Sequence, residues 1–184
     1  MAFIGAKPTN VPLTASDITD GSISVAKLTS ALDLSSNTVT LPAGVGGKVL
    51  QVVTATDSTE RTTTSGSYVT GSNTLLINIT PSSSSNKIFI SSSFQFKTSN
   101  VGGATTWYTL YRGGTNLGAD MSRTYIGGLS GQTAMWGQSL QILDSPNSTS
   151  EQTYQVYMRG DSGVTTYLNN NSTKGTITAF EIAG

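Results

Sequence analysis

The sequence contains neither cysteine nor histidine. Without cysteine the chain has no disulfide and no thiol nucleophile, and its redox compartment stays undecided. Without histidine it lacks the most common transition-metal ligand and the most common general base. Two residue types on which enzyme active sites most often depend are therefore missing.

Charge is scarce as well: 11% of the residues are charged, with ten of each sign and a formal net charge of zero. No run of Lys or Arg supplies the counterion release that drives nucleic-acid binding, so we expect no nucleic-acid partner. No apolar run reaches the roughly eighteen residues of a membrane-spanning helix, so we expect no membrane insertion. The start "MAFIGAKPTNVP" lacks the features of a secretory signal, and we expect an unprocessed chain.

The polar residues form only short, common patterns. "SVAK" and "SSNK" match the Ser-x-x-Lys spacing of some serine hydrolases, but no partner motif accompanies them. "GVGGKV" lacks the spacing of a phosphate-binding loop, and "DITDG" lacks the remaining ligands of a calcium loop. We therefore predict that the protein is not an enzyme and has no catalytic residue, no cofactor and no metal site.

Thr and Ser are abundant, with 29 and 26 residues respectively. Thr favours strands, whereas Ser and Gly favour turns. About eight short segments follow one another at roughly ten-residue spacing, and residues 75–79 and 154–158 alternate strictly between apolar and polar side chains. Residues 87–97 predict a strand whose apolar face is interrupted by Ser92. The sequence predicts an all-β protein with a C-terminal antiparallel β-sandwich, a jelly roll.

The aromatic residues divide the chain, because only Phe3 of the fourteen precedes Tyr68. Large aromatic side chains dominate core burial, so the β knob is expected over residues 62–184. Pro8 and Pro12 near the start, together with few large side chains, predict an extended N-terminal arm over residues 1–45. Residues 46–61 are predicted to form a hinge and a connecting strand.

Within the arm, "DGSISVAKLTSAL" predicts one short helix near residues 23–32. A helix of this length is marginal alone, so its apolar residues need a surface to cover them. We predict that the arm anchors the protein and brings copies of the chain together. The predicted arm contacts are Ile18, Ile23, Val25, Leu28 and Leu32.

Several predicted strands carry aromatic residues on both faces. Either one set lines the core and the other is scattered over the surface, or the second set is buried against a neighbouring copy. The candidates for a trimer or ligand surface are Trp107, Tyr111, Trp136 and Tyr157. A separate hypothesis is a carbohydrate-binding module in which tryptophan stacks on sugars, although burial in the core is the simpler expectation for both tryptophans.

Two parts of the chain resemble known proteins. "PTNVPLTASDITDGSISVAKLTSALDL" resembles the N-terminal or stalk segments of bacteriophage tail-fibre-type proteins. The blocks "TTTSGSYVTGSNTLLINITPSSSSNKIFISSSF", "YTLYRGGTNLG", "ILDSPNSTSEQTYQVYMRGDSG" and "TITAFEIAG" are similar, in order and spacing, to the trimeric C1q/TNF-like jelly-roll knobs of bacterial-virus structural proteins. Neither resemblance carries a catalytic or metal site that can be placed on this sequence.

The resemblance implies a homotrimer on the surface of a tailed-bacteriophage virion, made in the bacterial host cytoplasm. The arms would attach to other virion proteins of the capsid or tail, and the knobs would project. One expectation is a capsid decoration protein of the cement or head-fibre type, because few residues remain for a long shaft. The alternative is a tail-fibre or adhesin subunit whose knob binds a host-surface receptor or glycan.

Overall fold

The computed structural model describes residues 49–98, 102–127, 133, 135–161 and 163–184. The chain divides between Gly46 and Gly47 into two units, and all described residues belong to the second unit. The predicted arm, its helix and its five predicted contacts from Ile18 to Leu32 lie outside the described residues.

The described residues form eleven strands and one short 3-10 helix. In chain order the elements are β1 (Val49–Asp57), β2 (Arg61–Thr63), β3 (Leu76–Ile79), β4 (Lys87–Thr98), β5 (Thr105–Arg112), β6 (Thr115–Asn116), β7 (Ser122–Tyr125), β8 (Met135–Asp144), β9 (Gln152–Gly160), β10 (Thr166–Leu168), η3 (Asn170–Ser172) and β11 (Gly175–Ile182).

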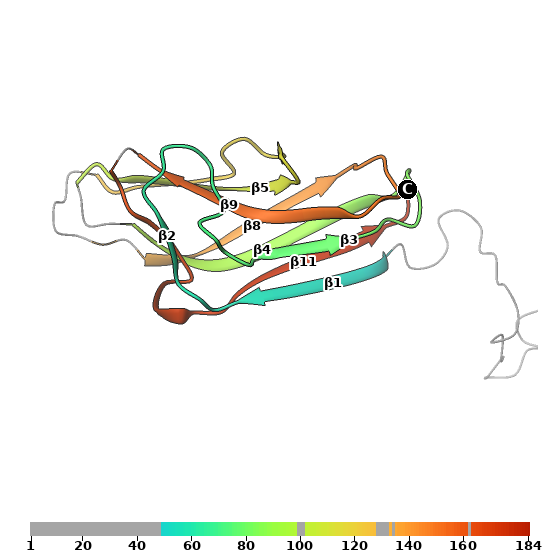
Figure 1. Cartoon of the computed structure of the whole chain (residues 1–184), viewed down its shortest axis with the longest axis horizontal. Helices are drawn as coiled ribbons and strands as arrows, with labels where there is room; N and C mark the ends of the chain where they lie inside the picture. The colour runs from blue at the N-terminus through green and yellow to red at the C-terminus, as the bar shows by residue number, and fades with distance from the viewer. Residues whose placement is uncertain (1–48, 99–101, 128–132, 134, 162) are drawn as a thin grey trace, which may run out of the picture. The chain divides into compact units, whose positions relative to one another are not determined.

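The strands form two antiparallel sheets that face each other, with β5 and β9 along one side of the sandwich and β11 and β1 along the other (Figure 1). The first, named the β4 sheet, has the order β1-β11-β4-β8, with β10 and β2 beside the end of β4. The second, named the β5 sheet, has the order β3-β9-β5, with β6 and β7 on the remaining edge of β5. This interleaving of strands distant in sequence is the order of a jelly roll. The predicted all-β antiparallel sandwich is therefore confirmed.

Strand β1 is a full member of the sandwich. It pairs with β11 from Val49 to Asp57, whereas the sequence analysis placed the strand predicted here before the knob, as a connecting strand. Val53 and Ala55 lie against the core, and Val52, Thr54 and Thr56 alternate with them on the outward face. A continuous apolar centre in the sequence conceals this alternation, because outward-facing Val52 is as apolar as inward-facing Val53.

The hydrophobic core fills the space between the two sheets and consists mainly of alternate residues of the longer strands, as residues 75–79 and 154–158 predicted. Ser92, which interrupts the apolar face of β4, is also buried. Its hydroxyl donates a hydrogen bond to the backbone carbonyl of Thr176 at 2.8 Å. The interruption is tolerated because the buried hydroxyl has a partner inside the fold.

Polar side chains also connect the two sheets across the core. The hydroxyl of Tyr108 on β5 donates to the backbone carbonyl of Tyr167 on β10 at 2.6 Å. At another point Asp144 on β8 accepts hydrogen bonds from Arg112 at 2.5 Å and from the Tyr154 hydroxyl at 2.7 Å. Burial raises the pKa of Tyr108 and of Tyr154, so both phenols remain protonated donors.

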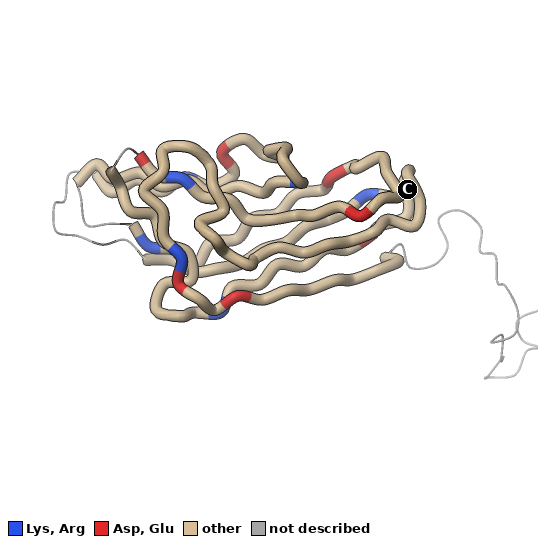
Figure 2. The backbone as a smooth tube through the Cα atoms, viewed as in Figure 1, with Lys and Arg blue, Asp and Glu red and all other residues tan. Residues whose placement is uncertain are grey.

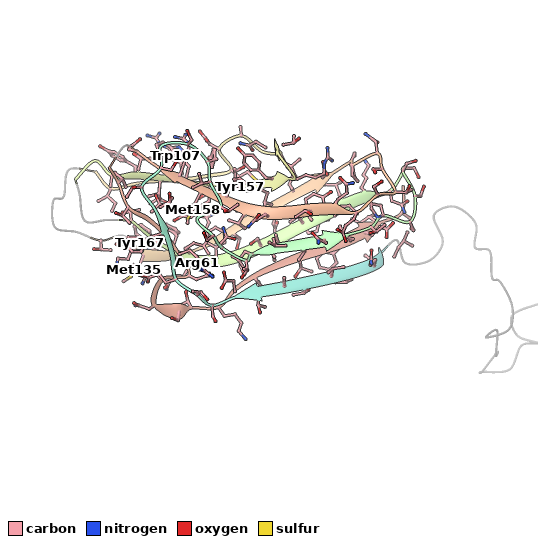
Figure 3. The ribbon with its side chains drawn as sticks, viewed as in Figure 1. Arg61, Trp107, Met135, Tyr157, Met158 and Tyr167 are labelled. Carbon is pink, nitrogen blue, oxygen red and sulfur yellow. The ribbon has the colours of Figure 1, made fainter. Side chains whose placement is uncertain are left out.

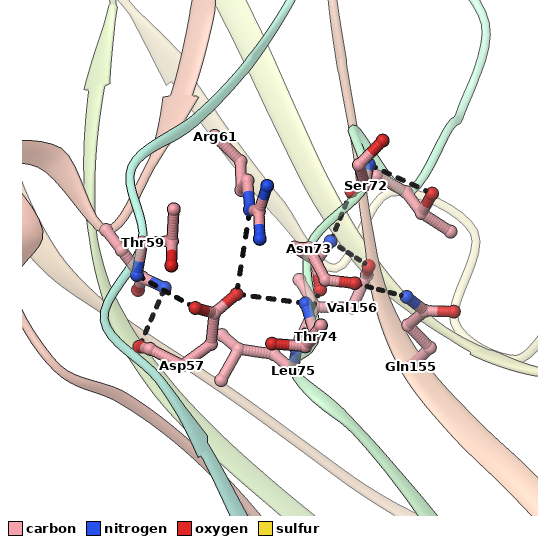
Figure 4. Close-up of polar contacts among 11 residues, drawn as sticks. Asp57, Thr59, Arg61, Ser72, Asn73, Thr74, Leu75, Gln155 and Val156 are labelled. Carbon is pink, nitrogen blue, oxygen red and sulfur yellow. Dashed lines mark hydrogen bonds and ion pairs between the residues drawn. The ribbon is translucent and has the colours of Figure 1, made fainter.

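Asp57 at the end of β1 fixes the neighbouring loops (Figure 4). Its carboxylate accepts hydrogen bonds from the backbone N–H groups of Thr59 at 2.8 Å and Thr74 at 2.9 Å, and Arg61 lies 4.0 Å away. Burial would raise the pKa of Asp57, but these hydrogen bonds outweigh it and hold the pKa below its usual range. The carboxylate therefore stays charged and joins the segment after β1 to the segment before β3.

Candidate interaction surfaces

Charged residues of the long strands of the β4 sheet lie at or near the strand ends (Figure 2). The outer face of this sheet has no charged side chain along β4 between Lys87 and Lys97, and Lys174, just before β11, borders the face beside Gly137. We name it the uncharged face. Its outward residues are Val52, Thr54 and Thr56 on β1; Thr176, Thr178 and Phe180 on β11; Phe89, Ser91, Ser93 and Gln95 on β4; and Gly137, Ser139, Gln141 and Leu143 on β8. Half of these side chains carry a small hydroxyl group, which makes the middle of the face smooth as well as neutral.

One row of the uncharged face is apolar. The strand register aligns Val52, Phe180, Phe89 and Leu143 side by side across four strands. The rings of Phe180 and Phe89 are 6.0 Å apart, and Val52 and Leu143 are 55% and 50% exposed. A continuous exposed apolar row bordered by neutral polar residues is typical of a surface that another molecule covers.

Hydroxyl groups form the adjacent rows. Thr54 and Thr178 share a hydrogen bond of 3.0 Å between their side-chain oxygens, and Ser93 and Thr176 share another of 3.0 Å. A depression of about 500 Å³ opens beside Gly137, which has no side chain to fill it. The hydroxyl groups of these rows therefore bond largely to one another. A partner would contact the rows through complementary shape and neutral groups rather than through charge.

The outer face of the β5 sheet has a different character. Arg159 on β9, Trp107 on β5 and Arg123 on β7 form one row across three strands. The guanidinium carbon of Arg159 lies 3.7 Å from the centroid of a Trp107 ring, and that of Arg123 lies 5.8 Å away. The arginines cover the indole, which is only 8% exposed although it points away from the core.

Asp120 completes this cluster from the loop before β7. Both of its carboxylate oxygens lie 3.3 Å from a terminal nitrogen of Arg159, and one accepts a hydrogen bond of 2.6 Å from the Tyr68 hydroxyl. The hydrogen bond from Tyr68 lowers the pKa of Asp120, with a further contribution from Arg159. The carboxylate is thus fixed and ionised while half of its side chain remains exposed.

Two tyrosines lie next to this cluster. The rings of Tyr111 on β5 and Tyr157 on β9 are stacked, with centroids 3.9 Å apart and an angle of 17° between the planes. Tyr68 lies 6.1 Å from Tyr111 and joins the pair to Asp120. Figure 3 shows Trp107 and Tyr157 on the side of the β5 sheet, far from Met135 on the opposite sheet.

The structure brings three of the four predicted surface residues together and separates the fourth. Trp107, Tyr111 and Tyr157 share the outer face of the β5 sheet, whereas Trp136 lies on β8 of the other sheet. Trp136 contacts Phe96, with ring centroids 5.9 Å apart, yet it is 58% exposed because it lies near the end of an edge strand. The expectation that both tryptophans are buried in the core is therefore wrong.

Asp120, Arg123 and Arg159 were not singled out by the sequence analysis. Each is an isolated charge in a stretch of turn or strand residues, and only strand pairing shows that they surround one indole. The alternation of Arg123 with Tyr125 and of Arg159 with Tyr157 was the available signal for the two arginines, and the sequence held none for Asp120.

Within the described ranges, no group of three or more His, Asp or Glu residues is placed to hold a metal ion. In the same part of the chain, no helix has the length and apolar character needed to cross a membrane.

Comparison with protein-family models and with curated proteins finds no match to this sequence. Among solved structures, the chain is similar to VP2 of infectious bursal disease virus in its subviral particle, with a TM-score of 0.35 and 16% identity over 73% of this chain and 38% of that chain. A similar match to the T13 particle of the same virus has a TM-score of 0.35 and 13% identity over 78% and 40% of the two chains. The chain thus spans well under two thirds of the length of these proteins.

Proposed function

We propose that this protein is a structural component of a bacteriophage virion and that it works as a homotrimer. The observation that carries the proposal is the uncharged face of the β4 sheet with its apolar row. A sheet face exposed to water would be expected to carry charged side chains along its length, whereas this face carries them only at the ends of β4 and at Lys174, which borders the depression beside Gly137. Burial of the apolar row and the hydroxyl rows beside it between copies would remove the apolar row from water without burying a charge within those rows.

The position of the apolar row links the knob to the predicted arm. Val52 lies three residues after the first residue of β1, so the row crosses the sheet at the end where the segment before residue 49 joins. The sequence resemblance of that segment to tail-fibre-type stalks supports a role in anchoring. The jelly-roll fold supports a virion protein only by analogy, because the same fold occurs in capsid proteins and in lectins.

Two places on the virion are compatible with this design. A capsid decoration protein of the cement or head-fibre type is the first. A tail-fibre or adhesin subunit is the second, and the aromatic and arginine cluster on the β5 sheet favours it because such a surface can bind a ligand. In both cases the arm would contact other virion proteins, and the knob would lie on the virion surface.

Light scattering on the purified full chain tests the trimer. We expect three copies per particle at micromolar concentration. Thr178→Lys places a charge in the middle of the uncharged face and should weaken association at least about 100-fold, because a buried unpaired charge costs several kcal/mol. The matched variant Thr115→Lys, on exposed strand β6 of the other sheet, should leave the mass unchanged.

A monomeric wild-type protein, or a Thr178→Lys variant that associates as well as the wild type, would refute burial of this face. Labelling intact virions and imaging the label tests the location and distinguishes head from tail. A chain lacking residues 1–45 should remain trimeric and lose attachment to the virion. Attachment of this truncated chain would show that the arm is not the anchor.

A further inference from the structure

We infer that the outer face of the β5 sheet binds an acidic oligosaccharide, through Arg123 and Tyr125 at one end and Tyr157 and Tyr111 at the other. The inference deepens the fibre candidate by naming a ligand class, and it rests on that candidate for its biological setting. The side chains of the site lie on the face of the sandwich opposite to the one proposed to join the copies.

The charge balance of the cluster favours an anion. Arg159 is neutralised by Asp120, with both carboxylate oxygens 3.3 Å from one guanidinium nitrogen. Arg123 has no ion pair within the described part of the chain and is exposed. A planar guanidinium with free N–H groups matches a carboxylate in a two-point hydrogen-bonded geometry, so Arg123 is the anion-binding group.

Aromatic rings lie at both ends of the strip. Tyr125 follows Arg123 by two residues on β7, so both face outward, and it is 59% exposed. At the other end the stacked rings of Tyr157 and Tyr111 are only partly buried, and no hydrogen bond within the described residues occupies their hydroxyl groups. Such rings offer an apolar face to the C–H surface of a sugar and a hydroxyl to its polar edge.

Asp120 supplies an acceptor for sugar hydroxyls. Its carboxylate is held by Tyr68 and Arg159, yet the side chain is 49% exposed, so it is oriented before a ligand arrives. Trp107 beneath Arg159 is buried and supports the guanidinium rather than meeting the ligand. A fixed carboxylate beside open aromatic rings favours a polyhydroxylated ligand over a simple anion.

The length of the strip indicates a ligand of more than one sugar unit. Arg123 on β7 and Tyr157 on β9 lie on either side of β5 and are offset by two residues along it, which separates them by about 12 Å. A ligand that reaches both residues must be longer than one sugar ring. A nucleic acid is disfavoured because its backbone requires several unpaired cations, and this cluster offers one.

An oligosaccharide array probed with the full chain tests the inference. The array holds oligosaccharides containing galacturonate, glucuronate, sialate or 3-deoxyoctulosonate, each beside its carboxyl-reduced counterpart. We expect at least one acidic member to bind about tenfold or more tightly than its reduced counterpart. Calorimetric titration with that member should then show that Arg123→Gln lowers the binding affinity about tenfold. Tyr157→Ala should lower the affinity by a similar factor, and Tyr157→Phe by a smaller one.

Lys87→Gln is the matched control, since it removes one exposed positive charge from the opposite sheet. Circular dichroism of each variant confirms that the sandwich is intact. The inference is overturned if no acidic member binds, if reduced and acidic members bind equally, or if Arg123→Gln behaves like Lys87→Gln. A trimer that fails to bind overturns the ligand site alone, whereas a monomer that binds overturns the trimer and keeps the site.

Discussion

Replacing Glu181 with glutamine tests how a buried carboxylate without a cationic partner stabilises this fold. Glu181 on β11 is 1% exposed, and one of its oxygens accepts three hydrogen bonds. The donors are the backbone N–H of Ser82 at 2.6 Å, the Ser82 hydroxyl at 2.7 Å and the side-chain amide of Asn86 at 2.7 Å. These bonds attach the loop between β3 and β4 to the last strand.

The expected loss of stability in Glu181→Gln follows from the loss of the negative charge of the carboxylate. A hydrogen bond to a charged group contributes about 1.5–3 kcal/mol, and one between neutral groups contributes about 0.5–1.5 kcal/mol. Glu181→Gln keeps an acceptor oxygen but removes the charge. Because the three bonds share one oxygen, we expect a total loss of about 2 kcal/mol at pH 7 rather than three separate losses.

The same substitution predicts a pH dependence of known sign. Burial would raise the pKa of Glu181, but the hydrogen bonds from Asn86 and Ser82 outweigh it and place the pKa below its usual range. A carboxyl group with a depressed folded-state pKa stabilises the fold above its unfolded pKa of about 4.3. This contribution is lost as the pH falls through the folded-state pKa, so the difference between wild type and variant should shrink below about pH 4.

Urea unfolding followed by tryptophan fluorescence, at one protein concentration and at several pH values from 7 to 3, measures this difference. Asp57 also has a depressed pKa, but it is present in both proteins and cancels in the comparison. A variant as stable as the wild type at pH 7, or a difference that stays constant with pH, would refute the reasoning.

Two further predictions concern backbone positions and are measured by thermal unfolding. Gly175→Ala should lower the free energy of unfolding by about 1–3 kcal/mol, because the added carbon would lie 2.5 Å from Asn169 Oδ1 and 2.8 Å from Leu75 Cδ1. The control is Gly114→Ala, which has open space around it and should change the free energy of unfolding by no more than about 0.5 kcal/mol. Ala119→Gly should raise the stability by about 0.5 kcal/mol, because Ala119 has a φ of 52° in the left-handed region, and an unchanged or lower melting temperature would contradict this.

Local patterns in the sequence were sufficient to predict strands and the inward face of several of them. The alternation in residues 154–158 places Tyr154 and Met158 in the core, and the scarcity of charge anticipates a neutral surface. The period of two is a property of a single strand, so it can be read without knowledge of the neighbours. The same logic did not separate the two faces of β1, because Val52 faces outward into the apolar row while the adjacent Val53 faces the core, and both are apolar.

Which strands lie side by side was decided only by the tertiary structure. Val52 meets Phe180, and Trp107 lies between Arg159 and Arg123, although these residues are far apart along the chain. The sequence by itself determined an all-β chain with little charge and no histidine or cysteine chemistry. The packing of two whole sheets against each other determined the strand order, because pairing is non-local, and that order assembled the apolar row on one face and the arginine and aromatic cluster on the other.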